Sequence, residues 1–154
     1  MSAYRIVRFV PAHLPEATDL WLTAWSRAMP QIDFEARRAW FVDYFGALRS
    51  RGADVICAFR SDNGAMAGFF THEKPGYIDQ LCVAADLWGS GAAIALLNEA
   101  KRLSGGHLTL DVNQDNPRAV RFYERERFRR VGDRRSPSGL ATWRLEWVDI
   151  SCVG

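Results

Sequence analysis

Small residues follow an apolar, strand-like run at the point where the sequence could best bind a ligand. Gly89, Gly91 and Ala93 remove side-chain bulk where a helix is predicted to begin. The first N–H groups of a helix have no partner inside the helix, and with the positive end of the helix dipole they attract phosphate. The glycine spacing matches neither a P-loop nor the dinucleotide fingerprint. The stretch predicts a phosphate site of another kind, although the same glycines could serve only a tight turn.

A second stretch with chemical potential follows the next predicted strand. Asn116 precedes Pro117, and this pair favours a helix start because the Asn side chain caps the helix and Pro lacks an N–H that would be left over. Ala119, Phe122 and Tyr123 then fall on one side of that helix. A tyrosine hydroxyl, with a pKa of about 10, stays protonated at neutral pH and can donate a proton.

Together the two stretches resemble the motifs of the GCN5-related N-acetyltransferase (GNAT) family. Its first motif has Arg or Gln, then Gly three positions later, then Gly or Ala after one more residue. Gly91 and Ala93 fit this pattern, whereas Trp88 stands at the Arg/Gln position. The positions that match the second motif are Asn116, Ala119, Phe122, Tyr123 and Phe128. Arg127 replaces the Gly that usually ends this helix, so it either adopts left-handed geometry or the helix end is built differently.

The resemblance, which covers roughly residues 3 to 148, implies a donor and a mechanism. It implies that acetyl-CoA binds between the two motifs and that an amine attacks it directly, without a covalent acyl-enzyme. Tyr123 matches the family's general acid, and a backbone N–H near Val83 would polarise the thioester carbonyl. The residues expected to hold acetyl-CoA are Leu81, Cys82, Val83, Trp88, Gly89, Ser90, Gly91, Ala92, Ala93, Asn116, Ala119, Phe122 and Tyr123.

The general base is left open among several groups. Asp79 lies within an apolar strand, where a carboxylate needs a partner. Strand alternation predicts that it shares a face with Leu81 and Val83, within reach of an attacking amine. We therefore place Asp79 first. The alternatives are Glu73, Tyr77, His72 and a chain of water molecules.

The elements that position these residues follow from the spacing of apolar side chains. Strands are predicted near residues 4–10, 53–59, 65–71, 77–84, 107–112, 129–133 and 140–147. Helices are predicted near residues 13–28, 33–52, 89–103 and 116–127. A helical crossover makes the fourth and fifth strands parallel. The expected fold is α/β (mixed α+β) and GNAT-like, with a mostly antiparallel mixed sheet of about seven strands and about four flanking helices, in a single domain over residues 1–154.

Composition and charge argue against several other classes of protein. Twenty Lys and Arg against 18 Asp and Glu give a net charge of +2, and 48% of the residues are hydrophobic, as in ordinary globular domains. Cys57, Cys82 and Cys152 lack paired spacing, so neither a disulfide framework nor a metal site is expected. Because no apolar run suits a signal peptide or a membrane span, we expect a cytoplasmic protein without a membrane partner. A homodimer is compatible with the sequence.

The function expected is transfer of an acetyl group from acetyl-CoA to a primary amine of a small molecule or a peptide. The alternative is an acyl-CoA-binding module of the same fold without catalysis, because Trp88 departs from the motif and no base is unmistakable. A nucleic-acid partner is ranked last: the arginines from Arg118 to Arg135 could follow a phosphate backbone, but the overall charge is small. The loop at residues 29–32 is expected to help select the acceptor.

Overall fold

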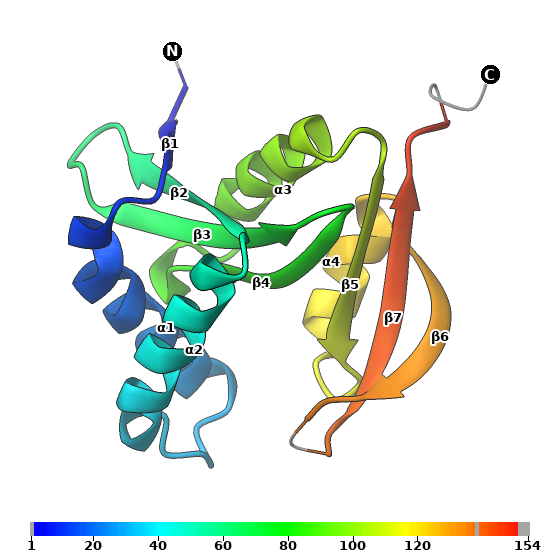
Figure 1. The fold of residues 1–154 in the computed structure, drawn as a ribbon, viewed down its shortest axis with the longest axis horizontal. Helices are drawn as coiled ribbons and strands as arrows, with labels where there is room; N and C mark the ends of the chain where they lie inside the picture. The colour runs from blue at the N-terminus through cyan, green and yellow to red at the C-terminus, as the bar shows by residue number, and fades with distance from the viewer. Residues whose placement is uncertain (1, 138, 151–154) are drawn as a thin grey trace.

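The protein is built on one seven-stranded mixed sheet (Figure 1). The structure, a computed structural model, describes residues 2–137 and 139–150. The strands are β1 (Tyr4–Arg8), β2 (Asp54–Arg60), β3 (Met66–Glu73), β4 (Tyr77–Val83), β5 (His107–Asn113), β6 (Arg129–Arg135) and β7 (Ala141–Val148). Their order in the sheet is β1-β2-β3-β4-β5-β7-β6. β4 and β5 run parallel and the other neighbours antiparallel, so the expected sheet is confirmed.

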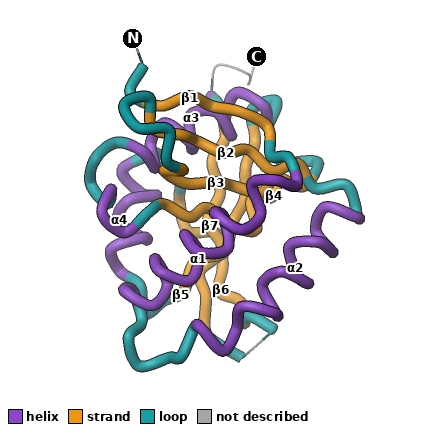
Figure 2. Tube along the Cα trace, turned by 90° about the vertical axis from the view of Figure 1, so that its left-hand side faces the viewer, coloured by secondary structure: helices purple, strands orange, loops and turns teal. Residues whose placement is uncertain are grey.

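Helices cover both faces of the sheet. They are α1 (Leu14–Ala28), α2 (Arg38–Ser50), α3 (Ala92–Leu103) and α4 (Pro117–Arg125). α1 packs on β3 and β4 beside α2, while α3 and α4 lie on the opposite face, as the positions of α2 and α4 on either side of the sheet show (Figure 2). None of the helices in the described part of the chain is long and apolar enough to cross a membrane.

Two apolar clusters fix these helices to the sheet. The cluster beneath α3 and α4 includes Phe70, Leu96, Leu97, Leu108 and Leu145. The cluster beneath α1 and α2 is aromatic and includes Trp21, Phe41, Phe45 and Phe69. Full burial of one such side chain contributes roughly 1.5–3 kcal/mol, so both layers are held firmly. Cys57 and Cys82 are free, buried thiols, whereas Cys152 lies outside the described residues.

β4 and β5 separate soon after they meet, and this creates the space for a site. Their pairing joins only Tyr77 to Thr109 and Ile78 to Leu110. In the part that does not pair with β5, β4 contains a bulge against β3. The three residue steps from Ile78 to Leu81 lie opposite only two steps in β3, from His72 to Phe70. An extra residue reverses the alternation of side chains.

The bulge interrupts the alternation on which the predicted direction of Asp79 depends. Ile78, Leu81 and Val83 all pack toward the cluster beneath α3, although Ile78 and Leu81 would face opposite ways in a regular strand. The alternation that predicted a shared face for Asp79, Leu81 and Val83 is thus interrupted between Ile78 and Leu81, and the direction of Asp79 stays a prediction. Burial, and after it the charge of Asp111 on β5, raise the pKa of Asp79.

Two helix ends depart from the simplest expectation for physical reasons. α3 begins at Ala92 rather than near Gly89, because a short 3-10 turn (Ala85–Leu87) and the left-handed Gly89 and Gly91, with φ of 83° and 94°, precede it. Beyond α4, Arg127 adopts φ 75°. It therefore takes the left-handed conformation that Gly usually supplies, at a cost of about 1–2 kcal/mol.

Candidate active site

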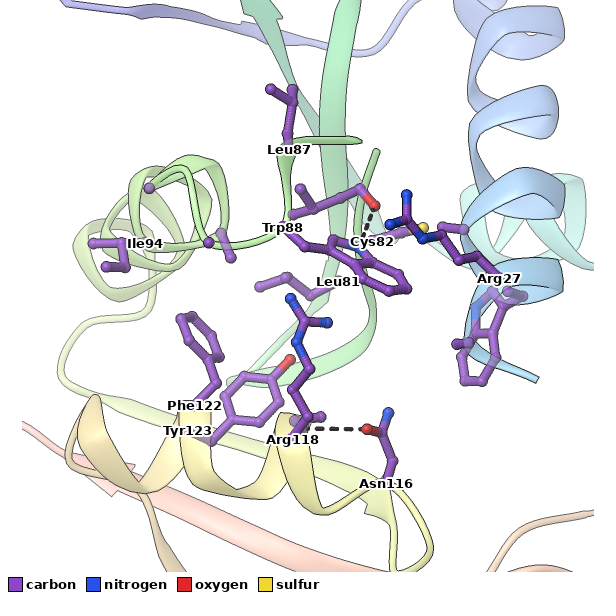
Figure 3. A pocket seen from close by; sticks show the side chains of 18 of the residues that line it. Arg27, Leu81, Cys82, Leu87, Trp88, Ile94, Asn116, Arg118, Phe122 and Tyr123 are labelled. Atoms are coloured by element: carbon purple, nitrogen blue, oxygen red, sulfur yellow. Dashed lines mark hydrogen bonds between the residues drawn. The ribbon is translucent and has the colours of Figure 1, made fainter. Parts of the chain in front are cut away.

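A cavity of about 650 Å³ opens where β4 and β5 diverge (Figure 3). Its walls come from the end of α1, the last residues of β4, the turn before α3, and one face of α4. The lining residues are Ala24, Trp25, Arg27, Ala28, Leu81, Cys82, Val83, Leu87, Trp88, Gly89, Gly91, Ala93, Ile94, Asn116, Arg118, Ala119, Phe122, Tyr123 and Arg125. Both sequence motifs thus meet in one space.

Two of the predicted binding residues do not line this cavity. The Ser90 hydroxyl donates to the Leu87 carbonyl at 2.6 Å and shares a 3.0 Å hydrogen bond with the Tyr4 hydroxyl. Ala92 is fully buried in the core beneath α3. The side chains of Ser90 and Ala92 are therefore engaged elsewhere, while every other residue of the predicted set borders the cavity.

The turn before α3 leaves backbone donors open to a ligand. Gly91 is the N-cap residue of α3 and has no side chain to cap the first N–H groups of the helix. A Cβ added to Gly89 or Gly91 would meet no atom within 4 Å, so the space above the turn is clear. The predicted helix-start site for a phosphate is consistent with this geometry.

The β4 backbone also faces the cavity. The N–H of Ala84 donates to the Ala67 carbonyl of β3. Because successive N–H groups of a strand point to opposite edges, the Val83 N–H points the other way, toward the gap between β4 and β5. The Val83 carbonyl accepts a 3.2 Å hydrogen bond from Trp88 Nε1, a cavity residue.

The charge of the cavity is positive. Three arginines line it, Arg27, Arg118 and Arg125, and no lining residue is an Asp or a Glu. Within the described ranges, no carboxylate forms an ion pair with Arg27 or Arg118. Cations gathered in a cleft without counter-charges raise the local concentration of anions. The cavity is therefore suited to a phosphorylated ligand.

Trp88 organises two of these cations. The guanidinium carbon of Arg118 lies 4.3 Å from the centre of the Trp88 ring, and that of Arg27 lies 5.4 Å away (Figure 3). Such cation–π contacts hold a guanidinium group in place while its N–H donors stay available. The side chain at position 88 is uncharged, and the neighbouring Arg27 and Arg118 supply the positive charge next to it.

Arg27 could not have been selected from the sequence. It lies on α1, far along the chain from both motifs, and reaches the cavity only because α1 crosses β4. Arg118 was visible as part of the arginine-rich run, but its contact with Trp88 required the fold.

Tyr123 points from α4 into the cavity (Figure 3). Its side chain is 8% exposed, and burial, helped by the neighbouring Cys82, raises the pKa of the phenol. The Phe122 and Phe128 rings hold it, with centroids 5.1 and 5.4 Å away. The hydroxyl makes no hydrogen bond to any residue that the structure describes. It is a hydrogen-bond donor without a partner among the described residues.

The candidate bases differ sharply in their surroundings. Glu73 accepts two hydrogen bonds from Arg51, at 3.0 and 3.1 Å. The Tyr77 hydroxyl donates to Asp111 at 3.2 Å, and burial raises the pKa of Tyr77 to about 12. Each of these groups is committed to a partner.

His72 and Asp79 lack such partners. His72 is only 4% exposed, its Nε2 has no hydrogen bond to the residues that the structure describes, and it borders no part of the cavity. Asp79 forms no hydrogen bond to the described residues. Burial, and next the charge of Asp111, raise the pKa of Asp79. It lies outside the cavity lining, next to the point where β4 and β5 separate.

A smaller pocket of about 100 Å³ adjoins the cavity. It is lined by Trp25, Ala28, Met29, Gln31, Asn113, Asp115 and Asn116. Trp25, Ala28 and Asn116 also line the larger cavity, so the two spaces share a wall. Met29 and Gln31 belong to the loop that the sequence suggested for acceptor selection.

This fold and this cavity define an acyltransferase of the GNAT class. Residues 12–127 match the model of the Acetyltransferase (GNAT) family. The chain belongs to this family, whose members are acyl-CoA-dependent transferases. No curated protein matches the chain in sequence.

Solved structures of the same fold cover nearly the whole chain. A GCN5-related N-acetyltransferase from Rhodopseudomonas palustris has a TM-score of 0.77 at 18% identity and covers 96% of this chain and 97% of its own. The PaiA N-acetyltransferase from Thermoplasma acidophilum, solved with coenzyme A, has a TM-score of 0.74 at 14% identity, covering 96% and 99%. The ribosomal-protein-S18-alanine N-acetyltransferase from Escherichia coli has a TM-score of 0.69 at 19% identity, covering 95% and 94%. At these identities the likeness shows the fold.

Proposed function

We propose that the protein transfers an acetyl group from acetyl-CoA to a primary amine. One observation carries the proposal: a single cavity joins a bare helix start, arginines without carboxylate partners and the free hydroxyl of Tyr123. These are the groups needed to hold a phosphorylated thioester and to protonate its leaving sulfur. The neighbour solved with coenzyme A supports the choice of donor.

The donor is held by its phosphates and by its arm. The pyrophosphate binds the N–H groups at the start of α3, near Gly91 and Ala93, and Arg27 and Arg118 neutralise its charge. The pantetheine arm follows β4, where the separation from β5 leaves strand edge without a neighbour. Trp88 keeps Arg118 over the cavity and satisfies the Val83 carbonyl until the arm replaces it.

The chemistry is a direct attack. The neutral amine nitrogen forms a bond to the thioester carbon as the carbon–sulfur bond breaks, giving an amide and free CoA thiol. The Val83 N–H stabilises the charge that develops on the carbonyl oxygen. Tyr123 donates its proton to the departing sulfur.

Asp79 receives the proton of the amine, directly or through water. A carboxylate is a better base as its pKa rises toward the working pH, which is the direction that burial gives Asp79. Its lack of another hydrogen-bond partner leaves it available for this role, unlike Glu73 and Tyr77.

The test is release of free thiol from acetyl-CoA in the presence of a panel of primary amines, with mass detection of the acetylated product. Transfer is expected with at least one amine and little thiol release without any amine. The alternative of a catalytically idle acyl-CoA-binding module predicts acetyl-CoA binding, seen as a thermal shift, with no amine-dependent thiol release. Absence of both binding and release would contradict the proposal.

A further inference from the structure

The small pocket of about 100 Å³ differs from the donor cavity in charge and polarity. It lies between the end of α1, the loop after it and the turn that joins β5 to α4. Its polar wall consists of Gln31, Asn113, Asp115 and Asn116, with no Arg, Lys or His among the lining residues. The adjoining cavity has three arginines and no carboxylate. The small pocket therefore carries a negative charge and the donor cavity carries positive charges, on the two sides of the wall that they share.

The polar groups of this pocket are available to a ligand. Among the described residues, the side chains of Gln31, Asn113 and Asp115 have no hydrogen-bond partner, whereas Asn116 caps α4 through the Ala119 N–H at 3.3 Å. The pocket volume of about 100 Å³ has room for a polar head group, since one water molecule needs only about 10–15 Å³ of such space.

We propose that this pocket binds a second positively charged group of the acceptor, so that the substrate is a primary amine carrying another ammonium group. This inference rests on the proposed acetyl transfer. The amine that attacks the thioester must be neutral and cannot be recognised by its charge. A second ammonium stays charged, and Asp115 with the amide oxygens of Gln31 and Asn113 offers it a carboxylate and neutral acceptors.

The same pocket disfavours acceptors with a different end group. A carboxylate on the acceptor would lie close to Asp115 and find no cation in the pocket. An uncharged alkyl end would leave the polar wall without partners. Of three acceptors of equal length, the diamine should therefore be best and the amino acid worst.

The experiment compares putrescine, butylamine and γ-aminobutyrate, which have the same four-carbon chain and differ at the far end. Initial rates of acetylation give kcat/KM for each, with putrescine corrected for its two equivalent amines. The wild-type protein should prefer putrescine to butylamine by roughly three- to tenfold, as for a partly solvated ion pair. γ-Aminobutyrate should be the poorest substrate.

Asp115→Asn supplies the decisive variant. It should reduce the preference for putrescine to near unity while leaving kcat/KM for butylamine and the KM for acetyl-CoA unchanged. Asp133→Asn is the matched control, because Asp133 is exposed on β6 and borders neither space. An equal preference in wild type and Asp115→Asn, or equal rates for all three acceptors, would overturn the inference.

The outcomes separate this inference from the proposed function. Acetylation of amines without preference for a second cation leaves the acetyl transfer intact and removes only the substrate class. Acetyl-CoA binding without acetylation of any of the three amines overturns the substrate class and favours an idle binding module. Failure to bind acetyl-CoA at all removes the proposed function itself.

Discussion

The donor cavity and the acceptor pocket share a wall but are built in different ways. The cavity takes its form from two local motifs: left-handed glycines before α3 and a capped helix start at Asn116. The pocket is assembled from the end of α1 and the β5–α4 turn, segments far apart in the chain. Phosphate groups that are the same in every donor molecule can be bound by a backbone pattern that is recognisable in the sequence. The acceptor is selected by loop side chains, which show no regular spacing in the sequence.

The largest effect should come from removing the proton donor of the donor cavity. Tyr123→Phe keeps the ring between Phe122 and Phe128, so the melting temperature and acetyl-CoA affinity should change little. kcat should fall by about 10²- to 10⁴-fold, the usual range for general-acid help. Tyr44→Phe, on α2 and outside both spaces, is the control. Turnover within about threefold of wild type would show that another group protonates the sulfur.

A smaller loss should follow from changing the proposed base, Asp79 on β4. Asp79→Asn should lower kcat by about ten- to hundredfold, because water can partly replace a general base. In the wild type, activity should be lost as the pH falls through the Asp79 pKa, which burial places above the ordinary carboxyl value. The variant should lose this acid limb. A pH–rate profile of unchanged shape would assign the base role elsewhere.

Binding of the donor should depend on arginine charge more modestly. Arg118→Gln should weaken CoA binding about tenfold, corresponding to roughly 1.4 kcal/mol for one charged hydrogen bond. Pantetheine, which lacks the phosphates, should bind wild type and variant equally. Arg121→Gln on the same helix is the control, since Arg121 does not line the cavity. Calorimetry that finds equal losses for CoA and pantetheine would contradict a phosphate role for Arg118.

The smallest effect concerns His72, a buried residue of β3 that lines neither region, and it limits the pH range in which the two regions can be compared. Burial lowers the pKa of His72. Below the unfolded-state value of about 6.5, the unfolded chain therefore binds more protons, and the free energy of unfolding falls by up to about 1.4 kcal/mol per pH unit. His72→Gln should flatten this dependence in urea titrations between neutral and mildly acidic pH. An equally steep decline in the variant would place the responsible proton on another group.

The sequence predicted the fold because the decisive signals were local. Apolar periodicity located the strands and helices, the helical crossover predicted the parallel β4/β5 pair, and the Asn116 cap was confirmed at the start of α4. Of the two alternatives left open for Arg127, left-handed geometry or a differently built helix end, its φ of 75° shows the first.

The features that could not be predicted come from interactions between distant segments. The β4 bulge depends on pairing with β3, where the Thr71 hydroxyl accepts a hydrogen bond from the Gln80 N–H, so alternation alone could not fix the direction of Asp79. Arg27 enters the cavity through the packing of α1 on β4. No pattern of neighbouring residues in the sequence indicates the bulge in β4 or the position of Arg27.

A crystal structure of the CoA complex would test most directly the claim that one space holds the donor and the adjoining pocket the acceptor. The account predicts the pyrophosphate at the start of α3 beside Arg27 and Arg118, the sulfur next to the Tyr123 hydroxyl, and the pocket around Asp115 left clear. CoA bound elsewhere, or a pantetheine arm that fills the pocket around Asp115 and leaves Tyr123 remote from the sulfur, would contradict it.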